Sequence, residues 1–298
     1  MANLKTLKTR IKSVKSTQKM TKAMKMVAAS RLKKAKIAVE SMRPYAEKIE
    51  EMIIDIASNI SVRGNLSEKF PLLTGKGKAH CHLILVISSD RGLCGGLNSA
   101  TVKFTRSKVR ELVSQGREVK IFCVGKKAYD QLKNIYPKKI IEQNFGIFKN
   151  NIDIDVAQII TNRLVELFNK EEFDVCEVIY SKFKSAIAQE QICKQLIPAP
   201  IKLENKTQED LNLEAPVSYE PNRDEILSQL LPKNLAVQIY NELLENSASE
   251  QGARMAAMEA ATNNAGKMIR DLTLVYNRTR QANITKELID IISGANVV

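Results

Sequence analysis

The residue types that most often carry out chemistry are few in this chain. Its two histidines, His80 and His82, lie on one face of the start of an apolar run, where they could in principle meet a cysteine, but no acidic ligand accompanies them. The five cysteines lack the paired spacing of a disulfide framework or a metal site, and most stand in apolar segments: Cys81, Cys94, Cys123, Cys176 and Cys193. We therefore expect buried thiols rather than nucleophiles, and neither a metal site nor a Ser/His/Asp or Cys/His catalytic set.

A glycine-rich turn follows that apolar run, at residues 90–98. In a doubly wound fold this is the place where a phosphate binds. The turn does not match the GxGxxG pattern, however, and it lacks the GKS or GKT ending of a P-loop. The sequence thus favours a tight structural turn over a nucleotide site, we expect no cofactor, and the chain is predicted to be a mechanical or binding protein.

The composition indicates a folded chain. Of its 298 residues, 44% are hydrophobic and 27% are charged, which is enough for a core in one large or two smaller domains. No run approaches the ~18 uncharged apolar residues of a membrane-spanning helix, so we expect no direct membrane insertion. The N-terminus lacks the apolar stretch of a secretory signal, and a reducing cytoplasm is the expected location.

Positive charge is concentrated at the N-terminus. The net charge is +13; residues 1–50 hold fourteen Lys and Arg against three acids, residues 51–221 twenty-four against twenty-one, and residues 222–298 eight against nine. A basic segment of this kind favours an anionic partner such as nucleic acid, a membrane surface or an acidic protein face. If the charge is considered by itself, a helix face exposed to solvent explains it equally well.

The first sixty residues carry a heptad repeat. Alternating steps of three and four residues from Leu4 to Ile60 meet seventeen positions, fourteen of them apolar. This period predicts a helix that supercoils around a partner, with Pro44 either kinking it or tolerated at a cost of about 3 kcal/mol. The polar exceptions occupy consecutive positions of the seam. Either the partner helix is polar there, or the two helices separate and these residues face something else. They are Gln18, Thr21 and Lys25.

A second heptad pattern runs from Leu230 to Ile289. It places apolar residues at twelve of eighteen positions, among them Met268 and Val275. Pro232 is expected to separate a short leading helix from the long one, since proline is tolerated at a helix start and not inside it. The two arms can pair antiparallel within one chain, which is the economical interpretation, or between two chains in a homodimer.

The middle of the chain alternates short apolar runs, typical of buried strands, with helical stretches. The expected strands lie at residues 82–89, 119–124, near 140, 174–180 and 191–197, and the expected helices run from the glycine turn to about 115, at 126–133 and at 155–169. We predict an α/β fold in which a doubly wound (Rossmann-like), mainly parallel sheet is inserted into a long antiparallel coiled coil. The expected domains are an N-terminal coiled-coil helix at 1–62, the α/β base domain at 78–203 and a C-terminal coiled-coil helix at 222–298.

Three parts of the chain together resemble the γ subunit of F-type ATP synthases, the central rotor shaft. They read STQKMTKAMKMVAAS at residues 16–30, SDRGLCGGLN at 89–98, and ARMAAM at 253–258 followed by NRTRQANITKEL at 277–288. The match covers the whole chain in order and spacing. The resemblance implies a non-catalytic subunit that couples rotation of the proton-driven c-ring to conformational change at the catalytic β subunits.

The resemblance also implies partners and contact residues. The partners are the α and β subunits of the catalytic head, the ε subunit and the membrane c-ring, at the cytoplasmic face of the bacterial inner membrane. The absence of a transit peptide before Met1 favours a bacterial chain, and the lack of paired cysteines argues against thiol control of the kind found in chloroplast relatives. The implied contacts of the shaft with the head are Met24, Lys25, Arg280, Gln281, Thr285 and Glu287, and those of the foot with the c-ring are Tyr219 and Glu220.

Two other classes of protein remain as alternatives. A basic coiled-coil RNA-binding protein would explain the N-terminal charge, but the first 40 residues hold no aromatic side chain on which a base could stack, and we expect no nucleic-acid partner. A doubly wound enzyme is weakened by the missing catalytic set.

Overall fold

A computed structural model describes residues 4–61, 69–77, 79–149, 152–200 and 222–295. The chain divides into two compact units, one of residues 31–253 and one that joins residues 1–30 to residues 254–298. Two long helices contribute to both units: α1 (Leu4–Ser61) and α8 (Arg223–Ala295).

Both long helices contain an internal proline. Pro44 lies inside α1 and Pro232 lies inside α8, so the expectation that Pro232 separates two helices is wrong. Packing explains the difference, because the neighbouring side chains of Leu231 and Leu235 are each only 5% exposed. Burial of two leucines offsets the roughly 3 kcal/mol that an internal proline costs.

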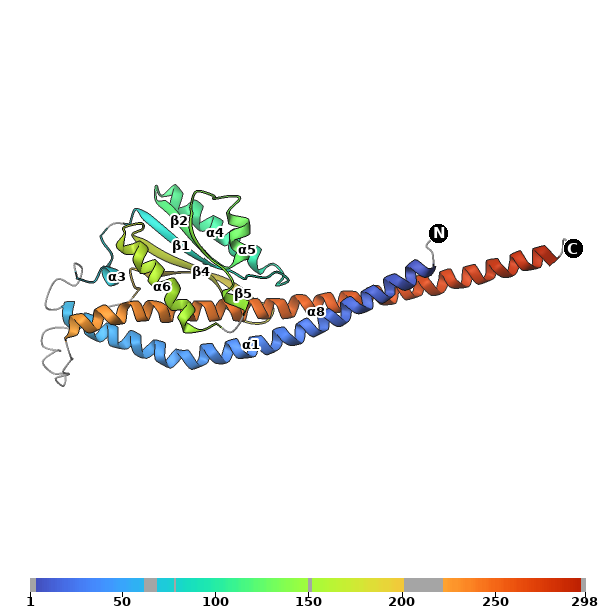
Figure 1. Ribbon diagram of the computed structural model, residues 1–298, viewed down its shortest axis with the longest axis horizontal. Helices are drawn as coiled ribbons and strands as arrows, with labels where there is room; N and C mark the ends of the chain where they lie inside the picture. Colours follow the sequence, from blue (N-terminus) through green and yellow to red (C-terminus); the bar gives the residue numbers. More distant parts are fainter. Residues whose placement is uncertain (1–3, 62–68, 78, 150–151, 201–221, 296–298) are drawn as a thin grey trace. The chain divides into compact units, whose positions relative to one another are not determined.

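The unit of residues 31–253 contains a five-stranded sheet in the order β3-β2-β1-β4-β5 (Figure 1). Strands β1 to β4 are parallel, and β5 pairs antiparallel with β4. The predicted mainly parallel sheet is confirmed, and each expected strand overlaps an observed one. The strands are β1 (Cys81–Ile87), β2 (Glu118–Val124), β3 (Ile140–Asn144), β4 (Val175–Phe183) and β5 (Gln189–Ile197).

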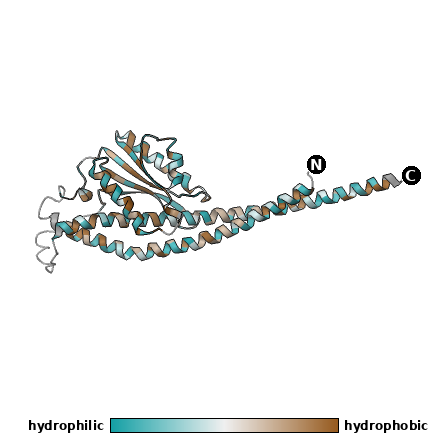
Figure 2. Cartoon of the chain, in the orientation of Figure 1, coloured by the Kyte–Doolittle hydropathy of each residue, from teal (hydrophilic) through white to brown (hydrophobic). Residues whose placement is uncertain are grey.

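Helices cover both faces of this sheet, whose strands are among the most hydrophobic parts of the chain (Figure 2). Alternate side chains of β1 point to opposite faces: Ile84 packs in one cluster with Val102 of α4, and Leu85 packs in another with Ile160 of α6. The sheet is therefore buried on both sides, as its continuous apolar strands require. The short helix α3 (Pro71–Thr74) precedes β1. The helices between the strands are α4 (Leu97–Ser114), α5 (Lys126–Leu132), the short 3-10 helix η1 (Ile147–Lys149) and α6 (Ile154–Asn169).

Helix α8 is itself part of the core of this unit. Leu235 and Ile239 belong to the apolar cluster that contains the β1 and α6 side chains. Leu227 and Leu231 join a separate cluster with Ile53 of α1. The first half of α8 thus packs on two neighbours, the sheet and α1.

The heptad seam of α1 is confirmed by burial. Every seam position from Leu4 to Ile56 is buried or half-buried, and none is exposed. In the smaller unit, side chains at 18 and 25 of α1 contact side chains or backbone at 262 and 259 of α8, respectively. Because the numbers rise on one helix and fall on the other, the two segments run antiparallel within one chain.

The predicted seam of α8 is wrong by one residue in its last part. Met268 and Val275 are 48% and 49% exposed, whereas the neighbouring Ile269 and Tyr276 are half-buried. Apolar residues occupy both adjacent stripes of the helix surface, so a fixed alternation of three and four residues could not tell which stripe faces α1. Side chains 284–292 are all exposed.

Candidate functional site

The polar positions of the α1 seam meet polar partners on α8. The hydroxyl groups of Thr21 and Thr262 share a hydrogen bond of 2.7 Å, and the side-chain amide of Gln18 donates to the Thr262 carbonyl at 3.4 Å. Lys25 Nζ lies 2.6 Å from Oε1 of Glu259. Of the two interpretations of the polar seam, the first therefore holds: the partner helix is polar where α1 is polar.

A shallow groove follows this polar seam along the surface of the helix pair. Three lysines and a single carboxylate border it, so its charge is positive, and it is open to an anionic segment of a partner. The groove is lined by Gln18, Lys19, Lys22, Lys25, Met26, Glu259, Thr262 and Asn263.

Of the two head contacts expected on α1, Met24 is half-buried and Lys25 is half-buried and paired with Glu259. More exposed apolar side chains lie close by, and sequence reasoning did not single them out: Met20, Met26 and Val27 are 63%, 61% and 55% exposed. The signal that could have found them is their position outside the heptad seam, on a face otherwise rich in lysine.

The four contact residues expected near the end of α8 are all exposed: Arg280, Gln281, Thr285 and Glu287. The Thr285 hydroxyl donates to the Gln281 carbonyl at 3.0 Å, so its lone pairs remain for a partner. Arg280 lies 18 residues beyond Thr262, about 27 Å along the helix at ~1.5 Å per residue. The expected contacts therefore form two separate sites, one around Lys25 and one around Arg280. The expected foot residues Tyr219 and Glu220 lie outside the described residues.

The glycine turn is held by its own polar groups. Oδ1 of Asp90 accepts a hydrogen bond from the backbone N–H of Lys126 at 3.2 Å, and Oδ2 accepts one from Phe148 at 3.1 Å. Asn98 Oδ1 accepts hydrogen bonds from both the backbone and the hydroxyl of Ser89. These contacts explain the turn as a structural element that ties β1 to the loops around it.

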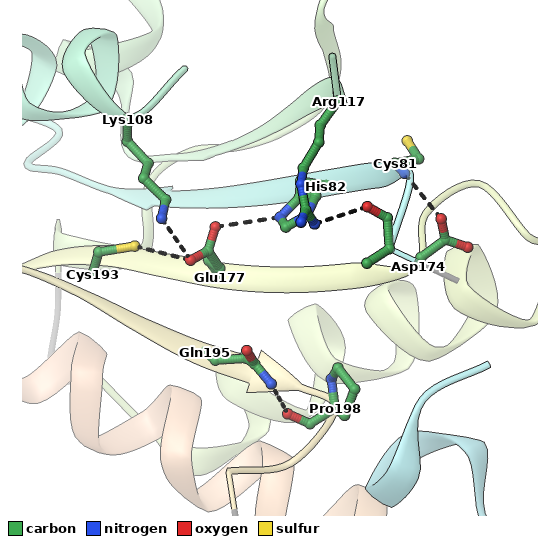
Figure 3. Close-up of polar contacts among 10 residues, drawn as sticks. Cys81, His82, Lys108, Arg117, Asp174, Glu177, Cys193, Gln195 and Pro198 are labelled. Carbon is green, nitrogen blue, oxygen red and sulfur yellow. Dashed lines mark hydrogen bonds and ion pairs between the residues drawn. The ribbon is translucent and has the colours of Figure 1, made fainter. Parts of the chain in front are cut away.

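His82 lies in a polar cluster between β1, β4 and α4 (Figure 3). Arg117 Nη1 is 2.7 Å from His82 Nε2, and because a guanidinium only donates, Nε2 accepts. The ring proton then lies on Nδ1, 3.5 Å from Oε2 of Glu177, whose Oε1 is 3.0 Å from Lys108 Nζ. With the Arg117 guanidinium on one ring nitrogen and the Glu177 carboxylate, itself paired with Lys108, near the other, His82 fits a structural role better than metal binding.

The charges of this cluster explain the ionisation of its carboxylate. Burial raises the pKa of Glu177, but hydrogen bonds from His82 and Lys108 and the positive charge of Lys108 outweigh burial and hold the pKa below its ordinary value. The thiols behave oppositely: burial raises the pKa of Cys81 to about 11 and those of Cys123 and Cys193 to about 12. Little thiolate exists at neutral pH, so these cysteines are poor nucleophiles.

Within the described part of the chain, no three His, Cys, Asp or Glu side chains gather closely enough to hold a metal ion. None of the helices in the described ranges is long and apolar enough to cross a bilayer.

Comparison with known proteins points to one family. The family model described as ATP synthase matches residues 3–298. The chain is 50% identical to the ATP synthase gamma chain of Nitrobacter winogradskyi and 49% identical to that of Azorhizobium caulinodans, and each match covers 100% of both chains.

Solved structures agree with this assignment. A chain of the Tetrahymena thermophila mitochondrial ATP synthase central stalk and c-ring is 27% identical, with a TM-score of 0.59 over 81% of this chain and 99% of that one. A chain of the Euglena gracilis mitochondrial ATP synthase shares the fold, with a TM-score of 0.67 at 18% identity over 99% of this chain and 94% of that one. The chain therefore belongs to the ATP synthase gamma-chain family.

Proposed function

We propose that this chain is the central shaft that couples rotation of a membrane c-ring to the catalytic β subunits of an ATP synthase. The single observation that carries the proposal is the antiparallel α1 and α8 pair, with a positive groove at its side and the exposed end of α8 beyond it. Family membership makes the chain a central-stalk component of an ATP synthase, and it gives no support to the RNA-binding alternative.

The shaft acts on the head through two sets of side chains. Lys25 lines the groove, Met24 precedes it on α1, and the exposed residues of α8 reach further along the shaft. In this proposal both sets touch the β subunits in turn as the shaft rotates. The set on α8 comprises Arg280, Gln281, Thr285 and Glu287. Because these groups are charged or polar and exposed, their contacts are easily broken, which a rotating part requires.

The base of the shaft is assigned to residues 78–203, with the coiled-coil arms at 1–62 and 222–298. In the proposal this base binds the ε subunit and the c-ring, with Tyr219 and Glu220 as the foot, at the cytoplasmic face of the bacterial inner membrane. The chain itself is non-catalytic and has no nucleic-acid partner. Torque and nucleotide affinity are linked reciprocally, so that ATP hydrolysis drives the shaft backwards.

Copurification from native membranes tests the proposal. A tagged chain should bring down the α, β and ε subunits and the c-ring in fixed ratio. Capture of RNA instead, with an affinity that falls steeply as salt rises, would replace the proposal with the RNA-binding alternative.

A further inference from the structure

The distal end of β4 has backbone groups that no neighbouring strand pairs. β1 accompanies β4 only as far as the pair Val86 and Ile179, whereas β4 continues to Phe183 with β5 on its other side. The N–H groups of Ser181 and Phe183 point away from β5, toward α8. Buried backbone groups of this kind need partners from elsewhere in the fold.

One turn of α8 supplies those partners. Asn246 Oδ1 accepts a hydrogen bond from the Ser181 N–H at 3.3 Å, and Glu245 Oε2 accepts one from the Phe183 N–H at 3.1 Å. The hydroxyl of Ser249 donates to the Ser181 carbonyl at 2.7 Å. Asn246 and Ser249 are 1% and 0% exposed, so water does not compete for the two bonds that they form with Ser181.

The next turn of α8 brings the strand still closer. A Cβ atom at Gly252 would lie 2.7 Å from Cε2 of Phe183 and 3.5 Å from Cα of Ala186, so any larger residue would force the Phe183 ring to move. Lys36 of α1 places its Nζ 4.7 Å from the centre of the same Phe183 ring. The end of β4 and the start of the β4–β5 turn are thus held by α8 on one side and touched by α1 on another.

We propose that these residues form a clamp that fixes α8 to the α/β domain against both sliding and rotation about the helix axis. Apolar packing earlier along the helix, at Leu235 and Ile239, is not directional and resists neither motion strongly. Three hydrogen bonds with defined geometry resist both. Gly252 lies one residue before Ala253, at which the compact unit ends, so the clamp acts near the end of the part of α8 that belongs to this unit.

The clamp gives the named residues a positioning role in the proposed shaft function. Torque applied to the α/β domain reaches the arm of residues 254–295 through α8, and the clamp determines how far that arm can twist relative to the domain. The residues are Phe183, Glu245, Asn246, Ser249 and Gly252.

The first test measures hydrogen–deuterium exchange at single residues in the assembled complex. Glu245→Ala removes the acceptor of the Phe183 N–H, and exchange of that amide should become about tenfold faster, as expected for loss of one hydrogen bond. Glu245→Gln keeps an acceptor oxygen and should leave exchange at Phe183 near the wild-type rate. Equal exchange in wild type and Glu245→Ala would overturn the clamp.

The second test measures the torsional stiffness of the rotor. With the c-ring fixed, thermal fluctuations of a probe on the exposed end of α8 should be wider in Glu245→Ala than in Glu245→Gln, at an unchanged subunit composition. Faster amide exchange at Phe183 without wider fluctuations of the probe would show that the contact does not position the shaft. This result would refute the positioning role of the clamp. If the chain does not copurify with the other subunits at all, this result contradicts the proposed shaft function and does not contradict the clamp.

Discussion

Glu242 of α8 is fully buried, and its Oε1 lies 3.0 Å from Nζ of Lys194 on β5. The side chain of Lys194 is 38% exposed. Burial raises the pKa of the Glu242 carboxyl, and the nearby Lys194 charge opposes this only in part. The contact between α8 and the edge strand therefore includes a carboxyl group that binds its proton more tightly in the folded chain than in the unfolded one.

This group should make the stability of the fold depend on pH. An acid whose pKa is raised on folding stabilises the fold below its unfolded pKa of about 4.3, and that stabilisation is lost as pH rises through the folded value. Glu242→Gln cannot ionise, so the loss of stability with rising pH should be smaller in this variant. Urea unfolding at a series of pH values measures the effect, and an identical slope in wild type and variant would contradict it.

The Lys25 and Glu259 pair should contribute little to stability. The two side chains are 36% and 53% exposed, and exposed ion pairs contribute about 0–1 kcal/mol. A double-mutant cycle of Lys25→Ala and Glu259→Ala, followed by urea unfolding, should give a coupling energy in this range. A value several times larger would mean that the pair is a structural lock of the two arms.

Arg280→Ala should slow ATP turnover of the assembled complex. A charge-assisted hydrogen bond from Arg280 to a β subunit is worth about 1.5–3 kcal/mol. If this bond forms in the transition state of the rate-limiting step, its loss should lower the turnover rate by roughly ten- to a hundredfold. Lys286→Ala, an equally exposed cation on the same helix, serves as the control. Unchanged turnover and assembly in Arg280→Ala would remove this residue from the contact set.

Met24→Lys should give a complex that assembles and hydrolyses ATP but couples poorly to proton pumping. Met24 is half-buried, next to Lys25 in the sequence, and a lysine there adds a charge that can find a carboxylate on a β subunit. The added interaction must break in every rotation. Protons pumped per ATP in membrane vesicles measure the effect, with Met24→Leu as the uncharged control; a normal ratio in Met24→Lys would refute the prediction.

A cysteine at Tyr219 and a second cysteine introduced in a polar loop of the c-ring should form a disulfide under oxidation, because the proposed foot touches the polar loops of the ring. Since both are rotor parts that move together, ATP-driven pumping should survive the cross-link. Failure to cross-link at this and neighbouring positions would place the foot elsewhere, whereas a cross-link that stops pumping would show relative motion of shaft and ring.

The elements of the α/β domain were predictable because each has a local signal. Continuous apolar runs such as that around Leu85 are typical of strands buried on both faces. Along α1, the apolar heptad pattern runs from Leu4 to Ile56 with polar residues only at 18, 21 and 25. The polar layer at Thr21 was visible as an exception to that repeat. Its partner Thr262 could not be identified, because the register between two distant segments has no local signature.

The buried polar face of α8 could not be predicted, because its local sequence pattern is typical of a surface exposed to solvent. Glu242, Asn246 and Ser249 recur at helical spacing and look like a solvated surface, yet all three are buried against the sheet. Their burial depends on unpaired backbone groups of β4, such as the Ser181 N–H, that exist only once the strands have assembled. Tertiary context therefore overrides the local pattern at the place where the sheet and the shaft meet.

The hydrogen bond between Thr21 and Thr262 also sets the length of the free tip of α8. Shifting α8 by one heptad in either direction would put Thr21 opposite Ile269 or Met255 and leave its hydroxyl facing an apolar side chain, so a single register is favoured. In that register the first described residue of α1, Leu4, lies near residue 279 of α8, and the helix runs on to Ala295. One polar layer thus leaves about 24 Å of single helix, at ~1.5 Å per residue, beyond the paired arms.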